Sequence, residues 1–85
     1  MEKRIAILGI IVENPQAVAQ INVLLHEFGS GILGRMGVPV REQGVNIISV
    51  ALCAPMNAIS ALSGRLGRLE GVNARVTYSG VTVPA

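Results

Sequence analysis

Two stretches of this 85-residue chain are apolar at nearly every position, which is the pattern of a strand buried on both faces. The first covers residues 5–12. The second covers residues 45–54, with Val45, Ile47 and Ala51 on one side and Ile48, Val50 and Leu52 on the other. The pattern therefore predicts two strands in the centre of a sheet.

Two other segments have the spacing of helices with one apolar side. Asn14 is a good N-cap and Pro15 suits the first helical position, so a helix is predicted to begin there and to end at 29–31. Pro55 opens a second helix, which Gly71 is expected to stop. The two apolar stripes are Ala17, Val18, Ile21, Leu24, Leu25 and Phe28, and Ala58, Ile59, Leu62, Leu66 and Leu69.

The remaining segments predict outer strands. Residues 32–40 form a glycine-interrupted strand, and the turn at 41–44 joins it to 45–54 as a hairpin. Residues 72–78 alternate apolar and polar side chains, which is typical of an edge strand with one wet face. Gly80 interrupts this pattern, and residues 81–83 either add edge strand or form a loose tail.

The element order β, α, β, β, α, β predicts an α+β fold of ferredoxin-like (βαββαβ) architecture, a four-stranded antiparallel sheet with two helices on one face. We expect one domain over residues 1–80 and a C-terminal tail over 81–85. The other face of the sheet would be bare and apolar in a single chain. The sequence thus predicts a homo-oligomer, dimer or tetramer, that associates through this open face.

Composition agrees with self-association, because 51% of the residues are hydrophobic and only 14% are charged. The longest apolar run, residues 5–12, is far shorter than the roughly 20 residues of a membrane-spanning helix, so no membrane partner is expected. The first residues do not have the pattern of a secretory signal, and the single cysteine, Cys53, has no partner for a disulfide within the chain, so neither feature is expected. A cytoplasmic location is the expectation.

Residues with catalytic or metal-binding chemistry are few and dispersed. Gly29, Gly31 and Gly34 spell G-x-G-x-x-G, but a helix precedes this motif and a strand follows it, the reverse of a dinucleotide site. His26 and Cys53 lie far apart, and the five acids form no pair. We expect no catalytic residue, no metal, no cofactor and no nucleic-acid-binding element, and therefore no enzyme.

The segment 34–41 is the most unusual part of the chain. It combines small residues, which let a partner approach closely, with two guanidiniums that bind anions. Gly34, Arg35, Gly37 and Arg41 are accordingly the predicted ligand-binding or interface residues. A glycine-bulged edge strand with solvated arginines is the alternative.

Four motifs together resemble one known family. They are Met1-Glu2-Lys3-Arg4 before an apolar strand, Val23-Leu24-Leu25-His26, the run from Arg35 to Glu42 (RMGVPVRE), and the run from Ala61 to Gly67 (ALSGRLG). They are similar to the small regulators associated with the iron-only hydrogenase system. That family is similar in turn to ACT domains and to the regulatory domain of the nickel-responsive repressor, in which effectors bind at subunit boundaries.

The resemblance implies a non-enzymatic regulatory module that oligomerises and senses a small effector at the subunit interface. It does not extend to the metal site of such repressors, since they use clustered His and Cys. The alternative is a structural or adaptor protein that acts only through oligomerisation or protein docking. The effector itself is not identified by the sequence.

Overall fold

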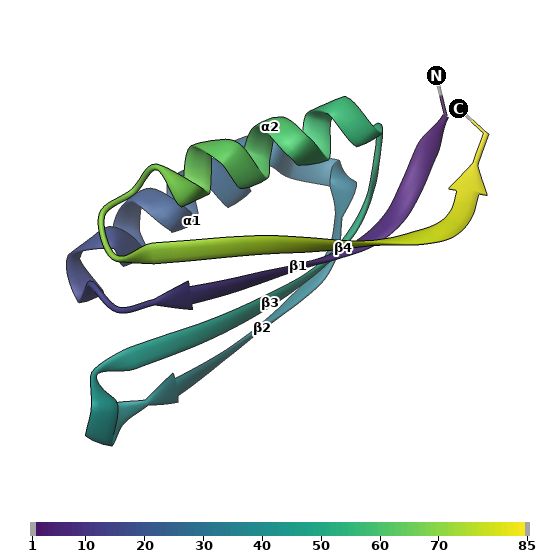
Figure 1. Ribbon diagram of the computed structural model, residues 1–85. Coiled ribbons are helices and arrows are strands. Elements are labelled where there is room, and N and C mark those ends of the chain that lie inside the picture. The colour runs from purple at the N-terminus through teal and green to yellow at the C-terminus, as the bar shows by residue number, and fades with distance from the viewer. Residues whose placement is uncertain (1, 85) are drawn as a thin grey trace.

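The computed structural model describes residues 2–84 and has the predicted element order (Figure 1). The sheet runs β2-β3-β1-β4 with every pair antiparallel, and both helices lie on one face. The α+β, ferredoxin-like prediction is confirmed, with the two doubly apolar strands in the centre. The elements are β1 (Lys3–Val12), α1 (Val18–Phe28), β2 (Ile32–Val40), β3 (Val45–Ala54), α2 (Met56–Gly67) and β4 (Val72–Val83).

Asn14 and Gly71 hold together the loops that precede α1 and β4. The Asn14 side-chain oxygen accepts a hydrogen bond from the Gln16 N–H at 3.1 Å, so Asn14 caps the 3-10 turn that leads into α1. Gly71 has φ +75°, and a Cβ there would lie 2.6 Å from Cβ of Asn14. Its carbonyl accepts from the Glu13 N–H at 2.7 Å. Only glycine satisfies both the backbone angle and this contact.

The second helix is shorter than predicted. It ends at Gly67, and residues 68–71 form a turn in which the Leu69 N–H bonds to the Leu66 carbonyl at 3.1 Å. Gly71, the expected stop, lies at the end of this turn. Leu69 still packs against the core, because the turn keeps its side chain on the inner side of the helix.

The core lies between the helices and the covered face of the sheet. It contains alternate residues of β1 and β3, the inner positions of both helices and the first residue of β4. Its members are Ala6, Leu8, Ile10, Val12, Ala17, Ile21, Leu25, Ile48, Val50, Leu52, Ala54, Ile59, Leu62, Leu66 and Val72. No polar side chain is buried among the described residues.

The other face of the sheet, termed the open face, is not covered by any helix (Figure 1). Strand register arranges its side chains in rows of four that run from β2 across β3 and β1 to β4. Large apolar side chains remain exposed on it, including Met36 at 63% and Ile7 at 55%. The rows are Val38, Ile47, Ile11 and Asn73; Met36, Ser49, Gly9 and Arg75; and Gly34, Ala51, Ile7 and Thr77.

Residues 81–83 belong to β4, so the strand does not end near Gly80. Thr82 pairs with Arg4 and Val83 with Lys3, after a register shift in β1 between Arg4 and Ala6. The Ser79 hydroxyl stabilises this irregularity: it donates to the Ile5 carbonyl at 2.7 Å and accepts from the Val81 N–H at 3.1 Å. Of the two alternatives for 81–83, added edge strand is the one observed. Met1 and Ala85, the outer limits of the predicted domain and tail, lie outside the described residues.

Candidate functional site

Strand β2 forms one edge of the sheet and carries three of the four predicted site residues. Arg35 pairs with Val50 and Gly37 with Ile48, so both lie on the helix-covered side. Gly34 pairs with Ala51 and lies on the open face, because successive strand residues point to opposite sides. Arg41 begins the turn of 3-10 helix η3 (Arg41–Gln43), beyond the end of the strand. The structure therefore brings Arg35 and Gly37 together and separates them from Gly34 and Arg41.

A groove of about 260 Å³ runs between β2 and α1, and Arg35 lies along it. The Arg35 Nη2 donates a hydrogen bond to Oδ1 of Asn22 on α1, at 2.9 Å. This contact orients the guanidinium across the gap between strand and helix. The rest of the lining combines apolar with polar groups: Val18, Gly37, Val38, Pro39, Asn46, Ile47 and Ile48.

Within the described residues, no carboxylate forms an ion pair with Arg35. The ion pair found within residues 2–84 is Arg65 with Glu27, at 3.9 Å and on the exposed surface of the helices. A guanidinium has five N–H donors, and the bond to Asn22 uses one of them. Gly37 adds no side chain to the groove, and a Cβ there would meet nothing within 4 Å. The groove thus offers a cation with free donors beside an apolar wall, an arrangement that suits a small anionic ligand.

Asn22 and Asn46 line this groove and were not predicted from the sequence. Asn22 is one of several polar residues on the outer side of the first helix and carries no distinguishing signal. Asn46 did carry a signal in the sequence. It has the parity of Ile48, Val50 and Leu52, which all lie in the core, so it is a polar residue where the pattern requires an apolar one.

The other candidate residues have structural roles or lie apart. Gly29 ends α1 with φ +71°, and Gly31 packs against Phe28, where a Cβ would lie 2.6 Å from the ring. The glycine motif therefore serves the reversal from helix to strand. His26 is exposed and Cys53 is half-buried on a different element. Within residues 2–84 no group of three His, Cys, Asp or Glu side chains is placed to hold a metal ion.

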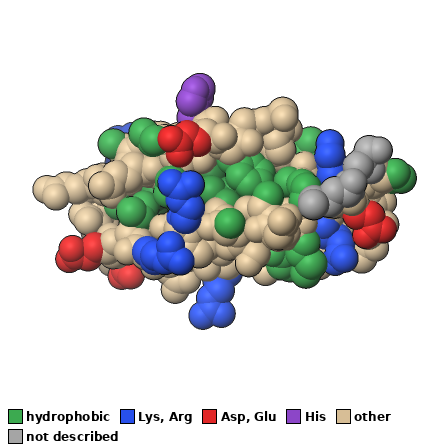
Figure 2. Space-filling view, turned by 90° about the horizontal axis from the view of Figure 1, so that it is seen from above, with side chains coloured by type: hydrophobic (Ala, Val, Ile, Leu, Met, Phe, Trp, Pro, Cys, Tyr) green, Lys and Arg blue, Asp and Glu red, His purple; other side chains and the backbone are tan. Residues whose placement is uncertain are grey.

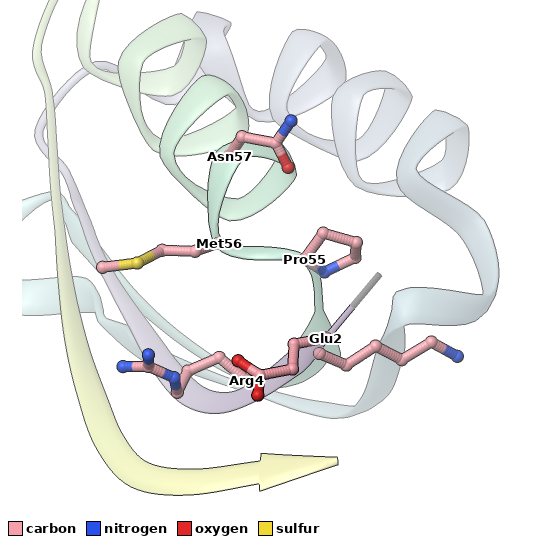
Figure 3. Close-up of a pocket in the computed structure, with 6 residues that line it drawn as sticks. Glu2, Arg4, Pro55, Met56 and Asn57 are labelled. Atoms are coloured by element: carbon pink, nitrogen blue, oxygen red, sulfur yellow. The ribbon is translucent and has the colours of Figure 1, made fainter. Parts of the chain in front are cut away.

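Among the further hollows in the described part of the chain are two with charged side chains in their lining. One, of about 250 Å³, is lined by Glu2, Arg4, Pro55, Met56 and Asn57 together with Lys3 (Figure 3). Its charges are mixed, and Arg4 already donates to the Ser79 carbonyl at 3.5 Å.

The other hollow, of about 360 Å³, lies between α1 and α2 on the side seen in Figure 2, where hydrophobic side chains gather between charged ones. Its lining includes Val23, Leu24 and Leu69, and it has Glu27 and Arg65, the exposed ion pair, as its only charged groups. Neither hollow presents a free, oriented charge as the Arg35 groove does. Within residues 2–84, neither α1 nor α2 has the length and apolar character of a membrane-spanning helix.

The fold defines an ACT-like domain. The ACT domain from the GTP pyrophosphokinase of Chlorobium tepidum superposes with a TM-score of 0.76 at 15% identity, covering 88% of this chain and 99% of that one. The nitrogen regulatory PII-like protein CPII from Thiomonas intermedia has a TM-score of 0.60 at 16% identity, covering 99% and 98%. At these identities the likeness establishes the fold alone.

A much nearer relationship identifies the family. The uncharacterized protein TM1266 from Thermotoga maritima has a TM-score of 0.85 and 43% sequence identity, covering 89% of this chain and 96% of that one. The family model TM1266-like, described as "Iron-only hydrogenase system regulator, putative", matches residues 4–76. The chain belongs to this family, which confirms the resemblance inferred from the sequence motifs. A comparison with curated protein sequences finds no match.

Proposed function

We propose that this protein is a non-enzymatic regulatory domain that binds a small anionic effector in the groove between α1 and β2 and associates with further copies through its open face. Membership of a regulator family supports the regulatory part of this proposal. The observation that carries the effector part is Arg35, which Asn22 holds at 2.9 Å and whose remaining donors face no carboxylate in the described structure.

Strand β2 connects the two proposed activities. Arg35, Gly37 and Pro39 lie on the groove side, whereas Met36 and Val38 alternate with them on the open face. An effector that displaces Arg35 or its strand therefore shifts the side chains offered to a second subunit. This coupling is reciprocal, so self-association changes effector affinity by the same factor.

The effector proposal is tested by thermal shift with a panel of small carboxylates and phosphates on the wild-type protein. A ligand at 100 times its Kd stabilises by about 2.7 kcal/mol, which is a shift of several degrees in a domain of this size. We expect Arg35→Ala to abolish the shift and Arg68→Ala, exposed in the turn that follows α2, to retain it. A panel that never raises the melting temperature, or a shift that Arg35→Ala retains, contradicts the proposed groove.

A structural or adaptor protein is the second candidate, and the open face favours it. Ile7, Met36 and Val38 are exposed there without any cover from their own chain. An adaptor needs this face but not the groove. Self-association together with a silent ligand panel therefore selects the adaptor.

A further inference from the structure

Along two strands of the open face, large apolar side chains alternate with glycines. On β1, Ile7 is 55% exposed and Gly9 follows it on the same face; on β2, Gly34 is followed by Met36. A Cβ added at Gly9 would meet only the Arg75 carbonyl, at 3.9 Å, and one at Gly34 would meet nothing within 4 Å. The space above both glycines is therefore left open by the chain itself.

The area of this face reaches the lower end of the range for stable dimers. Its strands have 9 to 12 residues. At about 3.3 Å per residue and about 4.8 Å between strands, the face measures roughly 30 Å by 19 Å, or about 600 Å². Standard interfaces bury about 800 Å² per partner, and twofold symmetric dimers are the commonest assembly. A second copy of the chain is therefore large enough to cover the open face as a dimer partner.

Charge restricts how two copies can stack. Arg75 is the only charged residue in the three rows of the open face. If the twofold axis crossed the sheet at the row of Gly9, Arg75 would face the partner subunit's Arg75, and Gly9 would face the partner subunit's Gly9. That arrangement opposes like charges and leaves a void in the centre.

A stacking with parallel strands fits no better. An axis along the strands places β1 over the partner's β3. Gly9 would then face the partner subunit's Ser49, and Ile11 would face the partner subunit's Ile47. In these two pairs a small residue would oppose a small one and a large residue a large one, which leaves a void at the first and overpacks the second.

We infer that two copies pack their open faces together with antiparallel strands and a twofold axis between the rows of Gly9 and Ile7. This inference rests on the self-association proposed above and specifies its geometry. Ile7 enters the space above the partner subunit's Gly9, and Met36 enters the space above the partner subunit's Gly34. Arg75 faces the partner subunit's Thr77 and reaches water at the sheet edge.

Thiol cross-linking distinguishes this arrangement from the others. On β3 the same axis places Cys53 opposite the partner subunit's Ile47, whereas the two Cys53 residues lie about 20 Å apart. With a bifunctional maleimide of about 10 Å span, we expect Ile47→Cys to yield covalent dimers. The wild type and the Cys53→Ser/Ile47→Cys variant, each with one thiol, stay uncoupled.

Cross-linking of the wild type indicates parallel strands and overturns the inference. An uncoupled Ile47→Cys protein that still sediments as a dimer also overturns it, while leaving the proposed self-association intact. A wild type that sediments as a monomer at micromolar concentration rejects both.

A residue exchange provides an independent test of the axis. We expect Gly9→Ile to fill the space for the partner subunit's Ile7 and to raise the dimer Kd roughly tenfold or more. The double variant Ile7→Gly/Gly9→Ile restores the fit, because the isoleucine then faces the partner subunit's glycine at position 7. Its Kd should return to within about fivefold of wild type. A double variant as weak as Gly9→Ile alone contradicts the register.

Discussion

The two faces of the sheet are built from the same strands and differ in what covers them. On β1, Leu8 and Ile10 are completely buried under the helices, whereas their neighbours Ile7 and Ile11 are 55% and 40% exposed on the open face. These four aliphatic side chains of β1 are chemically alike on both sides. The difference shows that an apolar side chain is not buried by its own chemistry alone. The helices bury the side chains on one face and leave those on the other exposed.

The largest expected effect is a difference in the free energy of unfolding between variants of the covered face and variants of the open face. Leu8→Ala removes a fully buried side chain and should lower the free energy of unfolding by about 2–5 kcal/mol. Ile7→Ala, one residue away, should cost less than about 1 kcal/mol under conditions where the protein is monomeric. Urea denaturation of both variants measures the contrast. Equal losses would mean that the open face is as well packed in the monomer as the core.

The second expected effect is the loss of self-association when the open face is changed. Ile7→Lys places a charge in the middle of the open face, where a second subunit would have to desolvate it. We expect a folded monomer in sedimentation velocity at concentrations where the wild type associates, with a melting temperature that is independent of protein concentration. Asn73→Lys, on the same face but at its edge and not opposite Arg75 in the inferred dimer, is the matched control and should weaken association much less.

A smaller effect concerns the end of the sheet where β4 extends beyond its predicted length. Ser79→Ala removes the hydroxyl that bonds to the Ile5 carbonyl and the Val81 N–H, so the protein should lose about 1 kcal/mol. Hydrogen exchange at residues 81–83 should accelerate, while exchange in the core strands stays nearly unchanged. Unaltered exchange at 81–83 would show that backbone pairing alone holds this segment.

The smallest expected effect on stability is at the groove. Arg35→Lys keeps the charge and loses the planar guanidinium that reaches Asn22, so the free energy of unfolding should change by less than about 0.5 kcal/mol at this exposed site. Ligand-induced stabilisation should nevertheless fall. A large loss of stability with unchanged ligand response would assign Arg35 a structural role instead.

The strands and helices were predictable because each has a local signal. The double apolarity of 5–12 and 45–54, the Asn14-Pro15 start and the alternation in 72–78 are properties of short stretches of chain. The end of β4 was not predictable, because it depends on Ser79 bonding to Ile5, 74 residues away in sequence. Which of the four predicted site residues lie together was predicted only in part. Arg35 and Gly37 lie together, but strand alternation and the end of β2 place Gly34 and Arg41 elsewhere.

By itself the sequence determined the class of fold, the central position of two strands, the surplus of apolar residues and the family. All of these follow from residue types at regular spacing or from local motifs. Only the tertiary structure decided which isoleucines are covered, that Asn22 and Asn46 join Arg35 in a groove, and that glycines and large side chains alternate on the open face. These properties arise from register between strands and from the packing of a helix on an edge, which no single segment contains.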